Sequence, residues 1–167
     1  MPNYSAGIEA GGSFMSDVKT EFVFTATFDV PQIRDLGPGP LGNRRIATVT
    51  GGKFEGPGIR GTALTSPGGD WLMYLDDGAT YLDVRVTLET DDGELIYMTY
   101  AGRRSGPPEV MAAMAAGQEV DPDSYYFRIA PVFETASKKY DWMNSAVFIG
   151  RGHRMPTGPI YHVHRVL

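Results

Sequence analysis

The sequence predicts an all-β protein, a single antiparallel β-barrel of about nine strands with one short helix. Three observations lead to this prediction. Short segments of alternating apolar and polar residues follow one another between turns rich in Gly, Pro and Asp. Residues 107–116 carry the one convincing helical pattern, whereas parallel strands would need a helix between them. The chain has 167 residues, of which 21 are Gly and 12 are Pro, and this suits one domain with many turns.

The predicted strands share a short apolar–polar alternation and end at turn residues. The clearest is residues 20–30, in which Phe22, Phe24 and Phe28 fall on one face. The others are predicted at residues 45–54, 59–64, 70–75, 79–90, 94–102, 125–135, 146–151 and 159–167. Residues 31–43 contain Gly-Pro-Gly-Pro and are predicted as an irregular loop.

Residues 79–102 predict a long hairpin whose two strands are joined by the Asp-Asp-Gly of residues 91–93. A three-residue loop places Leu88 opposite Ile96 and puts every large aliphatic residue on one face, whereas a two-residue loop would mix the faces. The opposite face carries polar groups: Asp83, Arg85, Thr87, Tyr97 and Thr99. The register does not determine which of the two faces points inward.

Composition divides the chain and excludes several classes of function. Residues 1–17 are small, polar and rich in Gly, which predicts a flexible or draped arm, and residues 18–167 are predicted to form the barrel domain. The net charge of −5, with both signs interleaved, argues against a nucleic-acid partner. The chain has no cysteine, which excludes disulfides and Cys-ligated zinc. Neither a membrane-spanning apolar run nor a signal-peptide pattern is present, so we expect a cytoplasmic protein without a membrane partner.

Common sequence motifs give little support to a metal or a cofactor. The Gly-rich residues 51–58 open no helix and lack the Lys-Ser/Thr of a nucleotide-binding loop. His162 and His164 share one face of a predicted strand, but no third ligand accompanies them, so two solvated histidines are the favoured interpretation. No Gly-x-Ser-x-Gly elbow indicates a serine hydrolase. We therefore predict no cofactor and no metal.

Polar residues at every second position of two predicted strands give the strongest indication of a site. Asp83 and Arg85 share a face of one strand, and Tyr126 and Arg128 repeat the pattern on a later one. In a barrel such faces can converge on a pocket, where desolvation shifts pKa values far enough for acid–base chemistry. The alternative is a polar side in water with Arg and Asp paired across it, and periodicity alone slightly favours this alternative.

Several blocks of the sequence resemble one family. They are GGKFEGPGIRG (51–61), GGDW (68–71), LDVRVTLETDDGELIYMTYAG (82–102), YFRIAPVFET (126–135), YDWMNSAVFIGRG (140–152) and IYHV (160–163). In this order and spacing they are similar to the signature of the DUF3237 family, also called uncharacterised protein family 0311. The resemblance implies a compact, broadly lipocalin-like antiparallel barrel that is often oligomeric. Some fungal relatives are associated with ring-forming steps in polyketide biosynthesis, which implies a cofactor-free cyclase or isomerase.

The resemblance tilts the prediction toward an inward-facing polar row, and its recurrent polar positions match every candidate residue except Tyr97, which the register of residues 79–102 supplies. The predicted catalytic residues are Asp83, Arg85, Arg128 and Glu134. The predicted ligand-binding residues are Asp70, Trp71, Tyr97, Trp142 and Asn144. In this hypothesis Glu134 or Asp83 moves a proton, and an arginine stabilises the negative charge that develops on an oxygen. The aromatic side chains hold a small, largely apolar, oxygenated molecule.

Two alternatives to an enzyme remain open. The same pocket can bind a small molecule without turnover, because aromatic walls and one charged anchor suffice for binding. The protein can instead be chiefly oligomeric, with the aliphatic face of residues 79–102 paired with another copy. We expect a small-molecule ligand and a homodimer or higher homo-oligomer.

Overall fold

The structure is a computed structural model that describes residues 17–167. Its strands are β1 (Thr20–Asp29), β2 (Gln32–Gly39), β3 (Gly42–Thr48), β4 (Gly51–Gly56), β5 (Ile59–Ala63), β6 (Gly69–Tyr74), β7 (Thr80–Thr90), β8 (Leu95–Ser105), β9 (Tyr126–Glu134), β10 (Phe148–Met155) and β11 (Gly158–Val166). One α-helix, α1 (Pro108–Ala115), follows β8, and a 3₁₀ helix, η1 (Asp141–Ser145), follows β9. The arm predicted at residues 1–17 falls almost wholly on residues 1–16, which lie outside the described residues.

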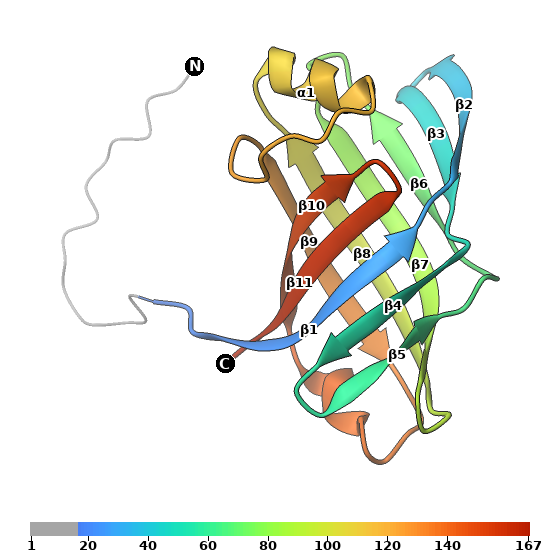
Figure 1. Cartoon of the computed structure of the whole chain (residues 1–167), viewed down its shortest axis with the longest axis vertical. Coiled ribbons are helices and arrows are strands. Elements are labelled where there is room, and N and C mark those ends of the chain that lie inside the picture. The colour runs from blue at the N-terminus through green and yellow to red at the C-terminus, as the bar shows by residue number, and fades with distance from the viewer. Residues whose placement is uncertain (1–16) are drawn as a thin grey trace.

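Eight of the strands close into an antiparallel barrel, as predicted from the sequence (Figure 1). The ring runs β7–β5–β4–β1–β11–β10–β9–β8 and closes where β8 pairs with β7. The remaining strands β6, β3 and β2 branch from the ring, because β7 pairs with β6 along its first half and with β5 along its second. Among residues 17–167 no helix is long and apolar enough to cross a membrane.

The structure has eleven strands instead of about nine, for two reasons. Residues 31–43, predicted as an irregular loop, form the hairpin of β2 and β3, in which Pro38 pairs with Asn43. β2 lies at the end of the strand order, where one side of the backbone has no partner strand, so proline costs no ladder hydrogen bond on that side. Residues 45–54, predicted as one strand, belong to two, β3 and β4, which pair with different neighbours.

The hairpin of β7 and β8 has the predicted register. The Thr90 amide donates to the Glu94 carbonyl at 2.9 Å, and the Gly93 amide donates to the Thr90 carbonyl at 2.8 Å. Gly93 adopts a φ of +84°, which favours glycine, so the loop has three residues. Leu88 consequently lies opposite Ile96.

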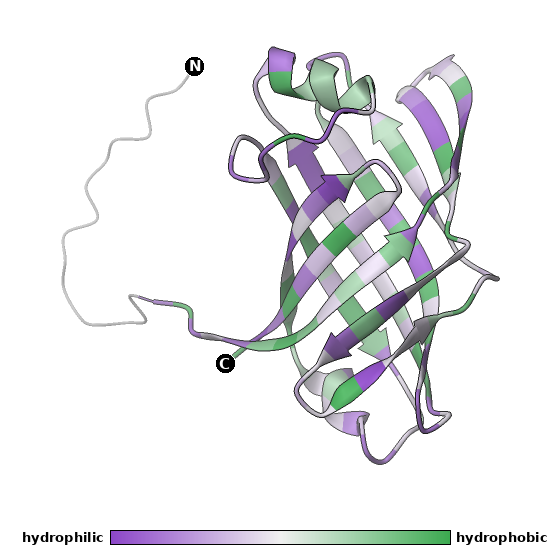
Figure 2. Ribbon diagram, in the orientation of Figure 1, coloured by the Kyte–Doolittle hydropathy of each residue, from purple (hydrophilic) through white to green (hydrophobic). Residues whose placement is uncertain are grey.

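The aliphatic face of this hairpin points into the barrel, so the prediction of an inward-facing polar row is wrong. Leu88, Ile96 and Met98 are fully buried, whereas Asp83 and Arg85 lie on the outside and form an ion pair at 3.0 Å. Burying one large apolar side chain is worth about 1.5–3 kcal/mol, while burying a charge costs several kcal/mol. The aliphatic face fills the core and is therefore not available as a subunit interface. Figure 2 shows the alternation of hydrophobic and hydrophilic residues along the strands.

The two ends of the barrel differ in packing. The end near the β7–β8 turn is filled with aromatic rings: Phe24 packs on Phe54 and Phe133, and Phe133 packs on Phe148 at a ring-centroid distance of 4.8 Å. The opposite end is covered by α1, close to the predicted residues 107–116 (Figure 1). None of the helix residues is fully buried, so α1 covers the opening without filling it.

Substitution of two adjacent residues of β8, one on each face, tests which face of the strand is buried. Ile96 is 0% exposed and Leu95 is 53% exposed. We expect Ile96→Ala to lower the free energy of unfolding by about 2–5 kcal/mol, because it leaves a cavity in the core. The matched control Leu95→Ala should cost less than about 0.5 kcal/mol in the same urea titration. Similar losses in both variants would contradict the inward aliphatic face.

Candidate active site

A partly open cavity of about 320 Å³ lies at the α1 end, between the barrel, α1 and the branching strands β2, β3 and β6. This volume is near the lower limit of small-molecule sites. Apolar side chains make up most of the wall, and α1 contributes Met111, Met114 and Ala115. The polar side chains of the wall come from five strands: Arg45, Asp70, Tyr74, Tyr100, Arg104, Arg154 and Tyr161.

Asp70, Tyr100 and Tyr161 meet at the inner part of this cavity. Strand alternation turns each of them inward, from β6, β8 and β11 respectively. Asp70 pairs in register with Val84, which in turn pairs with Tyr100, so the carboxyl and the phenol lie at one level of the barrel. The rings of Tyr100 and Tyr161 are in edge contact at 5.2 Å.

The Asp70 carboxyl is buried and has a raised pKa. Asp70 is only 9% exposed, and its Oδ1 accepts a hydrogen bond from the Asp83 amide at 3.1 Å. Burial raises the pKa of this carboxyl to about 7, against the smaller opposing effects of the Asp83 amide and the positive charge of Arg104. Both protonation states are therefore populated near neutral pH, as acid–base catalysis requires.

The two tyrosines remain protonated beside it. Burial, together with the nearby Asp70, raises the pKa of both phenols well above the usual range. The buried Tyr161 hydroxyl has no partner within hydrogen-bond distance among the described residues, although it interacts with the Tyr100 hydroxyl closely enough to affect the pKa of both phenols. An unpaired buried hydroxyl costs about 1–3 kcal/mol. The hydroxyl is therefore available to a ligand oxygen.

A glycine on β10 lets the wall close around Tyr161. Gly152 lies opposite Tyr161 in the β10–β11 ladder. A Cβ at Gly152 would lie 2.6–2.8 Å from ring atoms of Phe127, which is closer than packed carbons approach. The absence of a side chain thus allows Phe127 to pack against Tyr161 at a centroid distance of 5.4 Å.

Of the nine predicted site residues, Asp70 alone lines this cavity. Those on the outer surface or the loops are Asp83, Arg85, Arg128, Glu134, Trp71, Tyr97 and Asn144. The Asn144 side chain bonds to the backbone of Thr135, and half-buried Trp142 packs on Phe148. The structure does bring Asp83, Arg85 and Trp71 together, but on the outside of the barrel. The catalytic and binding roles assigned to these residues stay predictions.

Sequence reasoning missed Tyr100, Tyr161, Arg104 and Arg154. A signal was present for β8, because the register puts Tyr100 and Arg104 on the same face as Ile96 and Met98. Polar groups on an otherwise aliphatic strand face indicate a cavity or a buried network. Arg154 on β10 and Tyr161 on β11 do not stand out in this way, because the faces of those strands are not uniformly aliphatic. Only the closed barrel brings these two residues to the same cavity.

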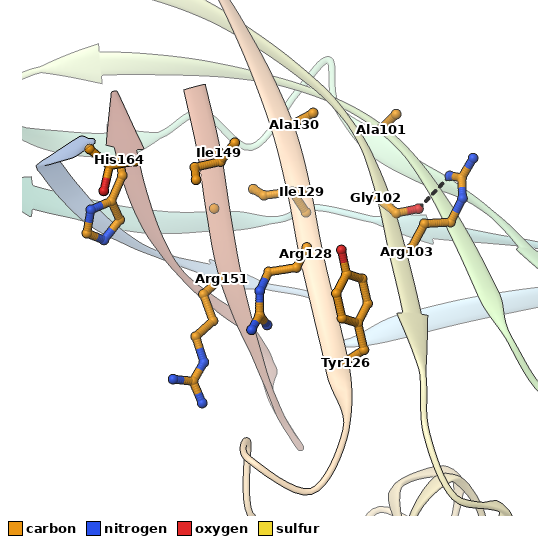
Figure 3. A pocket seen from close by; sticks show the side chains of 12 residues that line it. Ala101, Gly102, Arg103, Tyr126, Arg128, Ile129, Ala130, Ile149, Arg151 and His164 are labelled. Atoms are coloured by element: carbon orange, nitrogen blue, oxygen red, sulfur yellow. Dashed lines mark hydrogen bonds between the residues drawn. The ribbon is translucent and has the colours of Figure 1, made fainter. Parts of the chain in front are cut away.

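A larger groove of about 770 Å³ lies on the outer face of β8 to β11 (Figure 3). It carries Arg103, Arg128 and Arg151, which are already engaged: the first two donate to backbone carbonyls, and Arg151 pairs with Asp123. No carboxylate lines it, and it is open to solvent. The groove therefore lacks the buried acid–base pair of the inner cavity. Within residues 17–167 no cluster of three His, Asp or Glu residues is placed to hold a metal ion.

Comparison with known proteins places this barrel in one group. The model of DUF3237, described as a protein of unknown function, matches residues 18–166. A UPF0311 protein of Rhodopseudomonas palustris strain TIE-1 is 35% identical over 150 residues, which are 90% of this chain and 97% of that protein. The crystal structure of a conserved protein of unknown function from R. palustris has a TM-score of 0.88 and 34% identity, covering 90% of this chain and 99% of that chain. An enzyme from Penicillium herquei shares the fold, with a TM-score of 0.70, 21% identity and 93% and 99% coverage.

Asp70 should make stability depend on pH. Its pKa is about 7 in the folded state and 3.8 when unperturbed, so the folded state holds a proton that the unfolded state has lost. Stability is then fully present below pH 3.8 and falls by about 4 kcal/mol as pH rises through 7. Asp70→Asn removes this loss, so the variant should gain several kcal/mol relative to the wild type between pH 4 and pH 8.

Urea denaturation at several pH values measures this difference. Asp83→Asn is the matched control, since Asp83 lies outside the barrel, the variant keeps the backbone amide that bonds to Asp70, and the Asp83 charge raises the pKa of Asp70 much less than burial does. Parallel stability profiles for the wild type and Asp70→Asn would contradict the buried, raised-pKa carboxyl.

Proposed function

This chain belongs to the DUF3237 family, and we propose that it is a small-molecule enzyme that moves protons within its barrel cavity, as a cofactor-free isomerase or cyclase. One observation carries the proposal. A buried carboxyl with a pKa of about 7 lines a cavity that also presents two protonated tyrosines. Acid and hydrogen-bond donors of this kind are the usual components of proton transfer beside a carbonyl oxygen.

The chemistry assigns different roles to the three residues. The Asp70 carboxylate accepts a proton from an acidic C–H or O–H group of the substrate. Negative charge then develops on a substrate oxygen, and the Tyr161 hydroxyl, which has no other partner, donates a hydrogen bond to it. Tyr100, in ring contact with Tyr161, donates a second. The proton on Asp70 returns to a different atom of the substrate, which isomerises it, or to the group released by ring closure.

The cavity wall supports a small, largely apolar, oxygenated substrate. Phe28, Phe127 and Leu72 give it aromatic and aliphatic surface, while the polar groups are few and placed at defined positions. Its volume of about 320 Å³ suits a compact ring system. Ring closure and isomerisation, the reactions that the family resemblance implies, both require a proton to be moved beside an oxygen.

A binding protein without turnover is the alternative, and the polar groups argue against it. A carrier gains nothing from a carboxyl whose ionisation is opposed by burial or from a phenol left without a partner. Both features destabilise the fold, and sites that retain such costs are typically catalytic.

Proton exchange into deuterium oxide tests the proposal without knowledge of the substrate. A panel of bicyclic and tricyclic aromatic ketones, beginning with 2-tetralone, is incubated with the protein, and deuterium at the acidic carbon is followed by mass spectrometry. We expect exchange above buffer that rises with pH around an ionisation near 7. Asp70→Asn should slow it by about 10²–10⁴-fold, because the base is lost.

Glu89→Gln, which neutralises an exposed carboxylate on the outer face of β7, is the control and should exchange at the wild-type rate. Exchange by Asp70→Asn at the wild-type rate, or no exchange above buffer for any member of the panel, would remove the support for catalysis in this cavity and leave the binding alternative.

Tyr161→Phe separates catalysis from stability. The hydroxyl has no protein partner, so its removal should leave the melting temperature unchanged or raise it by a few degrees. The exchange rate should fall by about 10–10³-fold, as when one oxyanion donor is lost. A fall in melting temperature with an unchanged exchange rate would show that the hydroxyl is structural.

A further inference from the structure

The cavity contains a buried arginine with no acidic partner. Arg104 on β8 is only 7% exposed, and its Nε has no hydrogen-bond partner among the described residues. Its Nη2 donates to the Tyr74 hydroxyl at 3.2 Å and to the Thr80 hydroxyl at 3.3 Å, both long contacts to neutral groups. The guanidinium therefore carries its charge into the cavity wall without a counter-ion.

A second arginine strengthens the positive charge of this region. Arg154 on β10 also lines the cavity, where one of its Nη atoms donates to the neighbouring Met155 carbonyl and the rest of the guanidinium has no acidic partner; its pKa is lowered by burial and by the charge of Arg104. None of the ion pairs among residues 17–167 involves Arg104 or Arg154. Arg45, the third arginine of the wall, is paired with Asp35 at 2.9 Å. The cavity thus holds two arginines that lack an ion-pair partner.

Asp70 does not balance these charges. It is the only carboxylate of the lining, and burial keeps it partly protonated at neutral pH. The Asp70 backbone also lies at the inner level, beside Tyr100, whereas the Arg104 backbone lies four residues along β8 toward the α1 end, roughly 13 Å away, and the Arg104 charge offsets only a small part of the effect of burial on the Asp70 pKa. A buried charge that lacks a partner is costly, so such a group is commonly reserved for a ligand of opposite charge.

We propose that the cavity binds a carboxylate-bearing ligand, whose carboxylate is held by Arg104 and Arg154 beneath α1. The inference rests on the proposed function and extends it, because it adds the charge and the orientation of the substrate. The anionic end lies at the covered opening, and the apolar body extends inward. The reacting atoms then reach the level of Asp70, Tyr100 and Tyr161. Arginine suits this role because its planar guanidinium can bind both carboxylate oxygens at once.

A matched pair of probes tests the charge requirement directly. 2-Naphthoate and 2-naphthamide have the same ring and nearly the same shape but differ in charge. By isothermal titration calorimetry at pH 6, where Asp70 is mostly protonated, we expect the wild type to bind naphthoate at least about tenfold more tightly. Arg104→Met and Arg154→Met should each abolish this preference by weakening naphthoate binding, with little change for naphthamide.

Two controls keep the result interpretable. Arg151→Met removes an arginine from the outer groove and should keep the full preference. The two cavity variants are independent, so a failure of Arg104→Met to fold leaves Arg154→Met as the test. Equal affinities for the two probes in the wild type, including no binding of either, would overturn the proposal. So would a preference that survives in every cavity variant that folds.

Asp70→Asn distinguishes this proposal from the proposed function. The variant should lose deuterium exchange while it retains or increases the preference for naphthoate, because a neighbouring negative charge is removed. A naphthoate preference without any exchange in the wild type supports an anion-binding cavity that is not an enzyme. Exchange without the preference supports proton transfer on an uncharged substrate.

Discussion

In a closed barrel the side chains of each strand point alternately to the interior and to water, so apolar residues must occupy every second position. The rest of this structure depends on this alternation. The three-residue turn at 91–93 fixes the register of the longest hairpin, so Leu88, Ile96 and Met98 point inward together. The same register carries Tyr100 and Arg104 to the interior. One turn therefore determines both the hydrophobic core and two polar groups of the cavity.

One end of the barrel interior is packed with apolar side chains, and the other end contains the cavity. Packed aromatic rings fill the end near the 91–93 turn, and this packing stabilises the fold. At the α1 end the interior is hollow and polar groups replace rings. Asp70, Tyr161 and Arg104 each oppose folding there, through burial of a carboxyl, an unpaired hydroxyl and an unpaired charge. Such groups are tolerable only because the other end of the core is well packed.

Much of the fold could be predicted from the sequence, and little of the site. Strict alternation located β1, β7 and β8, and the Pro-containing start located α1, since each depends on neighbouring residues. β2 was missed because an edge strand tolerates the Pro and Gly that local rules assign to loops. The outward Asp83–Arg85 pair was mistaken for a lining because the family resemblance outweighed periodicity, which by itself slightly favoured a polar face in water with Arg and Asp paired across it. Asp70 was found through a family resemblance and not through its pattern.

The sequence by itself determined the strands, the hairpin register and the composition of each strand face, because these follow from the two-residue period and from turn chemistry. Only the tertiary structure decided which faces meet. Asp70 on β6 lies level with Tyr100 on β8 because both strands pair with β7. Tyr161 on β11 lies near them because the ring closes where β8 pairs with β7. The order in which the strands pair is not contained in any local pattern. The raised pKa of Asp70 and the unpaired charge of Arg104 arise from burial, which exists only once the ring has closed.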